Sequence, residues 1–354
     1  MITIGVDAHK GIHVALALDE AGRELGEWRG ANSLEGWHAL ADWAQALDES
    51  SQWGIEGAWS NGRGLAQYLV GLELTVFEIN ARWTARERRS SRKPGKSDRL
   101  DARAVARCVR EEAPKLPIVN AEDDTVLLDL LCSEREAAVA ESTRLRNQIH
   151  ALLLLVDPEY QRHLPSLTTA AGVLALRNYH VSPVAGPLQD YRAASVRRLA
   201  LRLQLAQDQA EDLADQIRAL ARAKYEPLTR LCGVNLLTAG ALAGMLGPGQ
   251  RFSSDAELAA YAGASPLETS SAGLVRHRLN RGGNRRLNAA LYRIVLTQAH
   301  YLPAARTYIA RRMSDGKTKR EAHRCLRRYV ARAIWRLWQE CLQAPLGSTA
   351  KIAA

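Results

Sequence analysis

The chain has 354 residues, of which 47% are hydrophobic, and it carries a formal net charge of +10 at pH 7. It is long enough to form two domains, or one domain with large additions, around buried cores. No stretch of about 18 apolar residues is present, and the N-terminus lacks the basic and apolar regions of a signal peptide. We therefore expect no membrane span and a location in the cytoplasm.

The five cysteines are scattered through the chain, at positions 108, 132, 232, 325 and 341. They form no C-x-x-C or C-x-x-H pair, so no zinc site is readable. An odd, dispersed set predicts free thiols in a reducing compartment.

The positive charge is concentrated in two segments. Residues 82–107 carry ten Lys or Arg against three acids, and residues 311–336 carry ten against two. Such clustering is typical of a surface that binds nucleic acid. The alternative is a soluble protein that is basic without a polyanionic partner.

The first part of the chain reads as alternating strands and helices. Three strands in succession form a meander, because the second alternates and a turn at Asp19–Gly22 precedes the third. The order β-β-β-α-β-α-β predicts a mixed sheet with helices on its faces. The expected strands are 2–7, 12–18, 24–29, 52–57 and 74–79, and the expected helices are 34–48 and 62–70.

A polar, basic stretch at 80–96 contains Pro94-Gly95 and predicts a loop. Ser97 is a good N-cap for a helix over 98–112. Further helices are expected over 123–156, 193–224 and 317–342. In the second of these the apolar residues alternate steps of three and four, which indicates a coiled-coil or hairpin seam; an ordinary amphipathic helix is the alternative. The seam residues are Val196, Leu199, Leu203, Ala206, Ala210, Leu213, Ile217 and Leu220.

Two aspartates, Asp98 and Asp101, lie three apart inside the basic segment, which places them on the same side of a helix. They are also acceptable as surface acids near a helix N-terminus. Asp7 and Glu56 each lie at the end of a predicted strand, where neighbouring strands bring separate side chains together. Four converging carboxylates repel one another unless a cation neutralises them, and hard oxygen ligands select Mg²⁺ or Mn²⁺.

Three features of the chain resemble the DEDD transposases of bacterial insertion sequences. They are Gly5-Val6-Asp7 at a strand end, Glu56 after a meander and a helix, and a helix with the motif K-S-D-x-x-D-A that starts at Lys96. These form the IS110 family, related to the Piv-type invertases, and the resemblance covers about residues 2–345. It implies a ribonuclease-H-like first domain, similar to the RuvC junction resolvase. It also implies that Asp7, Glu56, Asp98 and Asp101 are the catalytic metal ligands.

The resemblance extends to a loop in the second half of the chain. The family carries a Ser-Gly-rich turn five residues after a proline, and Pro266 plus five is Ser271. Ser271 is thereby implied to be a catalytic nucleophile that holds a DNA strand as a phosphoserine, with Ser270 as the alternative. By composition alone, such serines usually cap helices or form turns. Residues 231–247 are similar to the family's helix-hairpin-helix element, with Asn235 in place of its second glycine and tolerant of positive φ.

The expected fold class is α/β plus all-α. It comprises a RuvC-like DEDD domain over 1–120, a helical coiled-coil hairpin over 121–225, a helical transposase domain over 226–345 and a tail over 346–354. The basic residues expected to contact nucleic acid are Arg88, Arg89, Arg92, Lys93, Lys96, Arg276, Arg278, Arg281, Arg285 and Arg286.

The implied function is that of a transposase, a recombinase that cuts and rejoins DNA at the element ends and the target. The family also implies a guide RNA, a structured non-coding RNA that bridges donor and target, and a dimer or tetramer acting at the bacterial nucleoid. One alternative is a metal-dependent nuclease or Holliday-junction resolvase that uses water as its nucleophile. Another is a non-catalytic nucleic-acid-binding protein whose acids cap helices and form turns.

Overall fold

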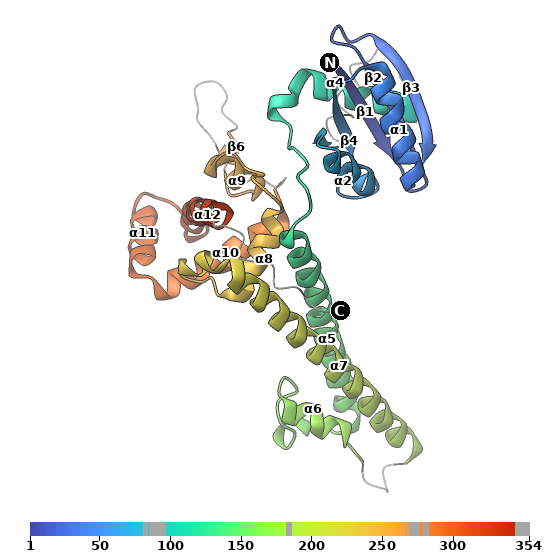
Figure 1. The fold of residues 1–354 in the computed structure, drawn as a ribbon. Coiled ribbons are helices and arrows are strands. Elements are labelled where there is room, and N and C mark those ends of the chain that lie inside the picture. The colour runs from blue at the N-terminus through green and yellow to red at the C-terminus, as the bar shows by residue number, and fades with distance from the viewer. Residues whose placement is uncertain are drawn as a thin grey trace. The chain divides into compact units, whose positions relative to one another are not determined.

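The computed structural model describes residues 1–80, 84, 97–181, 186–265, 267–268, 277–278 and 283–343. The chain divides into two compact units, Met1–Asp123 and Asp124–Ala354, and Figure 1 labels the elements of each. The expected loop at 80–96 lies almost wholly outside the described residues. The three-domain division remains a prediction.

The N-terminal unit has the predicted order of elements, with boundaries shifted by at most two residues. Its strands and helices are β1 Ile2–Ala8, β2 Ile12–Leu18, β3 Glu24–Ala31, α1 Leu34–Leu47, β4 Ser51–Glu56, α2 Arg63–Gly71, β5 Thr75–Ile79 and α4 Asp98–Glu112, followed by the 3₁₀ turn η1 Ala113–Lys115. The five strands form one sheet in the order β3-β2-β1-β4-β5. The β1–β2 and β2–β3 pairs are antiparallel, and β1–β4 and β4–β5 are parallel. This mixed sheet with its helices is consistent with the ribonuclease-H-like fold.

The two faces of the sheet bury different helices, because successive side chains of a strand point to opposite faces. Ile4, Val6 and Ile55 pack with Leu40 of α1 and Leu65 of α2 in one core. The opposite face packs against α4. Val14 and Leu16 meet its Ala102 and Ala106, and Phe77 and Ile79 meet its Val105 and Val109.

Two strand glycines make room for α4. A Cβ at Gly5 of β1 would lie 2.2 Å from both the Ala102 carbonyl oxygen and the Ala106 amide nitrogen of the helix. A Cβ at Gly54 of β4 would lie 2.4 Å from Val109 and 3.0 Å from Val105. Both glycines therefore allow the helix backbone to approach the sheet more closely than any other residue would permit.

The second unit is helical, apart from two short strands. Its elements are α5 Asp124–Val156, η2 Tyr160–Arg162, α6 Ala170–Arg177, α7 Pro187–Lys224, η4 Glu226–Arg230, α8 Leu236–Leu246, α9 Asp255–Tyr261, β6 Leu267–Glu268, β7 His277–Arg278, α10 Arg285–Tyr301, α11 Pro303–Ser314 and α12 Lys319–Gln343. Among the helices of the described ranges, none combines the length and apolar character that crossing a bilayer requires. All five cysteines are free thiols, as predicted.

The long helices α5 and α7 pack side by side (Figure 1). Helix α7 begins at Pro187, six residues before the expected start, and proline is favoured in the first turn of a helix. The predicted seam is correct at Val196, Leu203, Ala206, Ala210 and Ile217. It is wrong by one position elsewhere: the fully buried residues are Ala200, Ala214 and Ala221, while their leucine neighbours Leu199, Leu213 and Leu220 are only partly buried. Alanine fills these positions because its short side chain lets a neighbouring helix come close.

Asn235 does not use the positive φ that asparagine tolerates. This residue has φ −101° and ψ 177°, and its side-chain oxygen caps α8 by accepting a hydrogen bond from the Thr238 amide. The positive φ, +93°, belongs to Gly233 instead. Asn is among the best N-cap residues, so capping outweighs the left-handed turn that a second glycine would have supplied.

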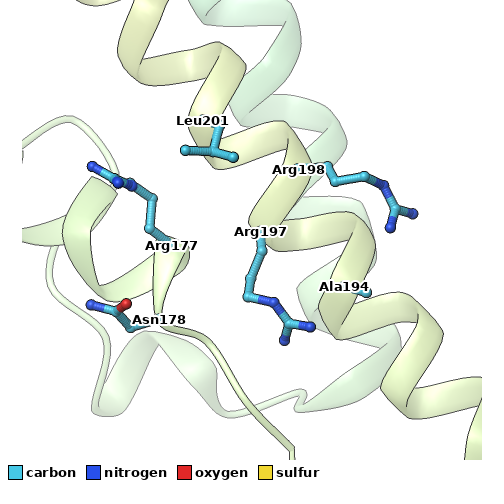
Figure 2. A pocket seen from close by; sticks show the side chains of 6 residues that line it. All are labelled: Arg177, Asn178, Ala194, Arg197, Arg198 and Leu201. Atoms are coloured by element: carbon cyan, nitrogen blue, oxygen red, sulfur yellow. The ribbon is translucent and has the colours of Figure 1, made fainter.

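The far end of the α5–α7 pair, formed by the C-terminal part of α5 and the N-terminal part of α7, has a core of its own. Leu145, Ile149 and Val196 pack there with Leu176 of α6 and with Tyr160. A pocket lies between the C-terminal end of α6 and the exposed side of α7, and Figure 2 shows the side chains that line it.

Candidate metal centre

Asp7 and Glu56 are brought together by strand pairing. They are direct neighbours in the parallel register of β1 and β4. The residues that precede them, Val6 and Ile55, point into the core formed with α1 and α2. Because successive side chains of a strand point to opposite faces, both carboxylates point to the face that α4 covers. The side chain of Asp7 is 11% exposed.

Asp98 and Asp101 reach the same place from α4. Ser97 caps this helix as predicted, since its hydroxyl oxygen accepts a hydrogen bond from the Leu100 amide. Asp101 belongs to the buried stripe that faces the sheet, next to Ala102 and Val105. Asp98, one turn earlier, lies at the more open end of the same side. All four predicted carboxylates therefore lie where β1, β4 and the start of α4 meet.

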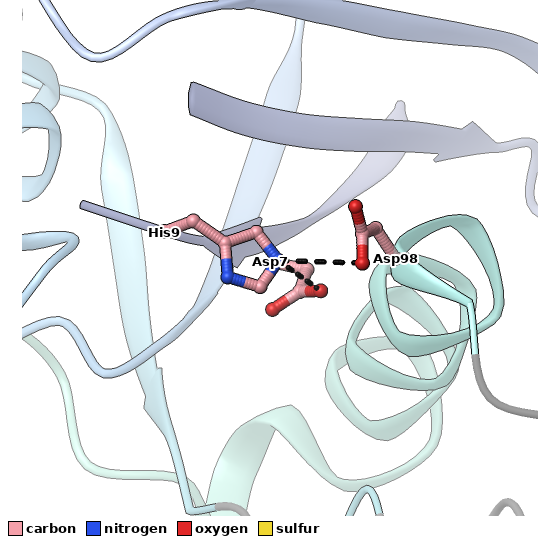
Figure 3. Close-up of side chains that lie close together, drawn as sticks. All are labelled: Asp7, His9 and Asp98. Carbon is pink, nitrogen blue, oxygen red and sulfur yellow. Dashed lines mark ion pairs between the residues drawn. The ribbon is translucent and has the colours of Figure 1, made fainter. Parts of the chain in front are cut away.

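His9 also belongs to this site, although no motif in the sequence analysis included it. Its Nε2 lies 3.1 Å from Asp7 Oδ2 and 3.5 Å from Asp98 Oδ1 (Figure 3). The ligand atoms of these three residues all lie within 4.8 Å of one another. Glu56 and Asp101 are not part of this tightest group. The nearness of His9 to Asp7 in the sequence was the only feature that pointed to it.

The four acids influence one another electrostatically. Burial raises the pKa of Asp7, and the charges of Asp101, Glu56 and Asp98 raise it further. His9 acts in the opposite direction and lowers the pKa of Asp7. A carboxylate surrounded by other carboxylates is costly to ionise unless a cation is bound beside it.

The site fits a divalent cation. Asp7 Oδ2 and Glu56 Oε2 are buried and have no hydrogen-bond partner among the described residues. His9 Nε2 is close to Asp7 but is not aligned to hydrogen bond with it. Buried carboxylate oxygens without donors, beside an imidazole nitrogen, are suitable ligands for Mg²⁺ or Mn²⁺.

The raised pKa of Asp7 gives a testable pH dependence. The folded protein holds the Asp7 proton more tightly than the unfolded chain, whose pKa is near 3.8, so stability falls as the pH rises above that value. Asp7→Asn removes this loss. In chelator-treated buffer we expect the variant to melt at a higher temperature than the parent at pH 7, with the difference shrinking toward pH 4.

Tryptophan fluorescence during thermal unfolding measures this difference, since six of the eight tryptophans lie in the N-terminal unit. A parent protein that melts above the variant at pH 7 without metal would contradict the predicted repulsion.

The predicted nucleophile Ser271 and its alternative Ser270 lie outside the described residues. The segment that contains them joins β6 to β7, which pair antiparallel with Leu267 opposite Arg278. Hydrogen bonds hold the flanks of this segment together: the Asn284 amide donates to the Tyr261 carbonyl at 2.7 Å, and Asn288 Nδ2 donates to the Ala262 carbonyl at 2.6 Å. Arg327 Nη1 in turn donates to Asn288 Oδ1 at 2.6 Å.

Most of the basic residues expected to contact nucleic acid are also outside the described side chains. These are Arg88, Arg89, Arg92, Lys93, Lys96, Arg276, Arg278 and Arg281. Arg285 is exposed at the start of α10. Arg286 instead pairs with two acids of α5, Asp129 at 2.7 Å and Glu136 at 3.4 Å.

Arg99 and Arg103, which belong to the basic segment 82–107, have structural partners. Arg99 pairs with Glu24 and Glu27 of β3, and Arg103 lies 3.0 Å from Glu24. These pairs attach the exposed side of α4 to the edge strand. Part of the charge that indicated nucleic acid therefore serves to hold the helix that carries Asp98 and Asp101.

Two family models match the chain. A transposase model of the DEDD type, from IS110 elements, matches residues 4–158, which include all four carboxylates and His9. A model of the transposase IS116/IS110/IS902 family matches residues 225–310, which include Ser271. The matched residues make up more than half of the chain. The chain belongs to the IS110 family of transposases.

Curated relatives of this IS110-family chain come from several bacteria. An uncharacterized protein of insertion element IS110 from Streptomyces coelicolor is 31% identical over 64% of the chain and 66% of its own length. The transposase for IS1328 from Yersinia enterocolitica is 26% identical over 51% of the chain and 52% of its own length. An uncharacterized protein of IS900 from Mycobacterium paratuberculosis is 24% identical over 95% of both chains. The first match thus spans just under two thirds of its relative.

Proposed function

We propose that this protein is the transposase of an insertion sequence and that it cuts and rejoins DNA. The observation that carries the proposal is the convergence of Asp7, Glu56, Asp98 and Asp101 where the C-terminal ends of β1 and β4 meet the start of α4. Within the described residues, a buried oxygen of Asp7 and one of Glu56 have no hydrogen-bond donor. Membership of the IS110 family supports the same activity.

In this proposal the four carboxylates hold Mg²⁺ or Mn²⁺, and His9 lies beside them as a further ligand or proton acceptor. A divalent ion bound there supplies charge stabilisation to the oxygens of a phosphoryl transfer. The sheet contributes Asp7 and Glu56 on a rigid backbone, while α4 contributes Asp98 and Asp101. Fixed carboxylates of this kind cost little reorganisation during the reaction.

Ser271 is the proposed nucleophile. Its hydroxyl loses a proton as its oxygen bonds to phosphorus, the bond from phosphorus to the oxygen of the cut strand breaks, and that oxygen takes up a proton and leaves as an alcohol. The strand is then held as a phosphoserine. Attack by the hydroxyl of another strand on that phosphorus releases the serine, so one bond forms and one breaks in each step.

The proposed partners are DNA, at the element ends and at the target, and a structured guide RNA. The DNA partner rests on the family and on the basic segments, and the RNA partner rests on the resemblance stated above. The paired helices α5 and α7 are suited to coiled-coil association in a dimer or tetramer. The protein then acts in the bacterial cytoplasm at the nucleoid.

Ser271→Ala tests the covalent step. The protein, with Mg²⁺ and labelled element-end DNA, is incubated with and without RNA from the flanking non-coding region and is then denatured in SDS. We expect a labelled protein–DNA band with the parent and none with Ser271→Ala, because the variant has no hydroxyl to form the bond.

Ser270→Ala is the matched control and should retain the band. Loss of the labelled protein–DNA band with Ser270→Ala but not with Ser271→Ala would identify Ser270 as the nucleophile. Free nicked DNA that forms equally with the parent and Ser271→Ala, and never with protein attached, would establish a metal-dependent nuclease that uses water and would overturn the recombinase proposal.

A further inference from the structure

The pocket at the far end of the helical hairpin is lined with arginines. It has a volume of about 440 Å³, and its lining residues are Arg177, Asn178, Ala194, Arg197, Arg198 and Leu201. Figure 2 shows Arg177 and Asn178 on the α6 side and the other four residues along α7. The pocket lies wholly within the second unit and shares no residue with the carboxylate site or with the basic segments identified from the sequence.

The three arginines have no acidic partner in the part of the chain that the structure describes. Among the described residues, no carboxylate lies within ion-pair distance of Arg177, Arg197 or Arg198. Other arginines of α7 do have acidic partners, since Arg202 lies 2.9 Å from Glu141 and Arg218 lies 2.7 Å from Asp215. Three guanidinium groups without acidic partners among the described residues line one hollow, and such a concentration of positive charge favours a bound anion.

Neutral groups orient these guanidinium groups without reducing their charge. Arg177 Nη1 donates to Gln204 Oε1 at 2.7 Å, Arg197 Nη1 donates to the Tyr179 carbonyl at 2.8 Å, and Arg198 Nη2 donates to Ser195 Oγ at 2.8 Å. Each bond uses one nitrogen, so each planar group keeps further N–H donors for a ligand. Guanidinium donors match the oxygens of phosphate.

An exposed aromatic side chain adjoins the pocket. Tyr191 is 67% exposed, and the guanidinium carbon of Arg198 lies 5.4 Å from the centre of its ring. Such a ring offers a flat surface on which a nucleobase can stack beside the cation. Arginines with an adjacent exposed ring suit a polymer of phosphates and bases better than a free phosphate ion.

We propose that the α6–α7 pocket binds the phosphodiester backbone of a nucleic acid, through Arg177, Arg197 and Arg198. RNA and DNA share this chemistry, and either is a possible source of the backbone. This binding site is separate from the proposed site of DNA cutting and rejoining, and binding to it requires no metal.

The test compares binding of a short DNA duplex and an RNA duplex of the same sequence, by fluorescence anisotropy in chelator over a range of salt concentrations. The parent protein is compared with a full-length double variant, Arg177→Gln with Arg198→Gln, in which both changed side chains are exposed. We expect the double variant to bind on the order of 10-fold more weakly, with a salt dependence whose slope is smaller by about 1 to 2.

Arg202→Gln with Arg218→Gln is the matched control. It removes the same charge from the same hairpin, but from arginines that already have acid partners. Leu201→Glu, at a position 53% exposed, is a second variant that adds a carboxylate to the pocket and should also weaken binding. Weaker binding of the RNA duplex alone, or of the DNA duplex alone, supports the proposal and shows which nucleic acid the pocket binds.

Equal effects of the pocket variant and its control would show only a loss of net charge and would overturn the proposal. An unchanged slope in a folded pocket variant would do the same. Because the assay contains no metal and no reaction, its outcome is independent of whether the carboxylates or Ser271 act in catalysis.

Discussion

Asp98→Asn should lower Mg²⁺-dependent processing of element-end DNA by at least about 10²-fold, equivalent to about 3 kcal/mol. The reason is that Asp98 Oδ1 lies in the tight group with Asp7 and His9, and an amide replaces its charged oxygen with a weaker ligand. Its side chain is 43% exposed, so the fold should tolerate the change. Cleavage rates at saturating DNA, with parent and variant at equal concentration, measure the loss.

Glu35→Gln is the control for this variant. Glu35 also lies in the first turn of a helix of the N-terminal unit, α1, where it accepts a hydrogen bond from Ser33 Oγ. The variant removes the same kind of helix-terminal charge from a helix that packs on the opposite face of the sheet from α4, and it should retain activity. An Asp98→Asn protein as active as the Glu35→Gln protein would mean that Asp98 is only a favourable charge at a helix end.

Gly5→Ala should destabilise the N-terminal unit by about 2 to 3 kcal/mol and also reduce activity by about 10²-fold. The new Cβ would lie 2.2 Å from two backbone atoms of α4, which cannot rotate away as a side chain would. The helix must therefore shift and carry Asp98 and Asp101 with it. Chemical denaturation followed by tryptophan fluorescence, together with the cleavage rate, measures both effects.

Gly71→Ala is the matched control, because a Cβ at the last residue of α2 meets nothing within 4 Å. It should leave stability and activity unchanged or raise stability slightly, since alanine has the higher helix propensity. A Gly5→Ala protein as stable and active as Gly71→Ala would show that close contact of α4 with β1 does not position the aspartates.

The sheet and its carboxylates could be predicted because their patterns are local. The strand over 12–18 alternates, Ser97 caps the following helix, and strand-end positions imply where Asp7 and Glu56 point. In the N-terminal unit, the helix boundaries followed from the same caps and turns. The topology that pairs β1 with both β2 and β4 then brings the predicted residues together.

The missed features depend on partners distant in the sequence. His9 joins the site only because α4 returns across the sheet, which no local pattern around His9 indicates. The alanine seam of α7 depends on how closely the neighbouring helices approach, and hydrophobicity alone favoured the larger leucines. Arg286 is paired with acids more than 100 residues earlier, so its positive charge alone overstated its availability to nucleic acid.

The most direct test of the central claim is a titration of Mn²⁺ into the protein without DNA, followed by the electron paramagnetic resonance of the free ion. We expect the parent to remove Mn²⁺ from solution in a saturable way, Asp98→Asn to bind it more weakly, and Glu35→Gln to behave as the parent does. Equal Mn²⁺ binding by all three proteins, or none by the parent, would contradict a metal centre built from Asp7, Glu56, Asp98 and Asp101.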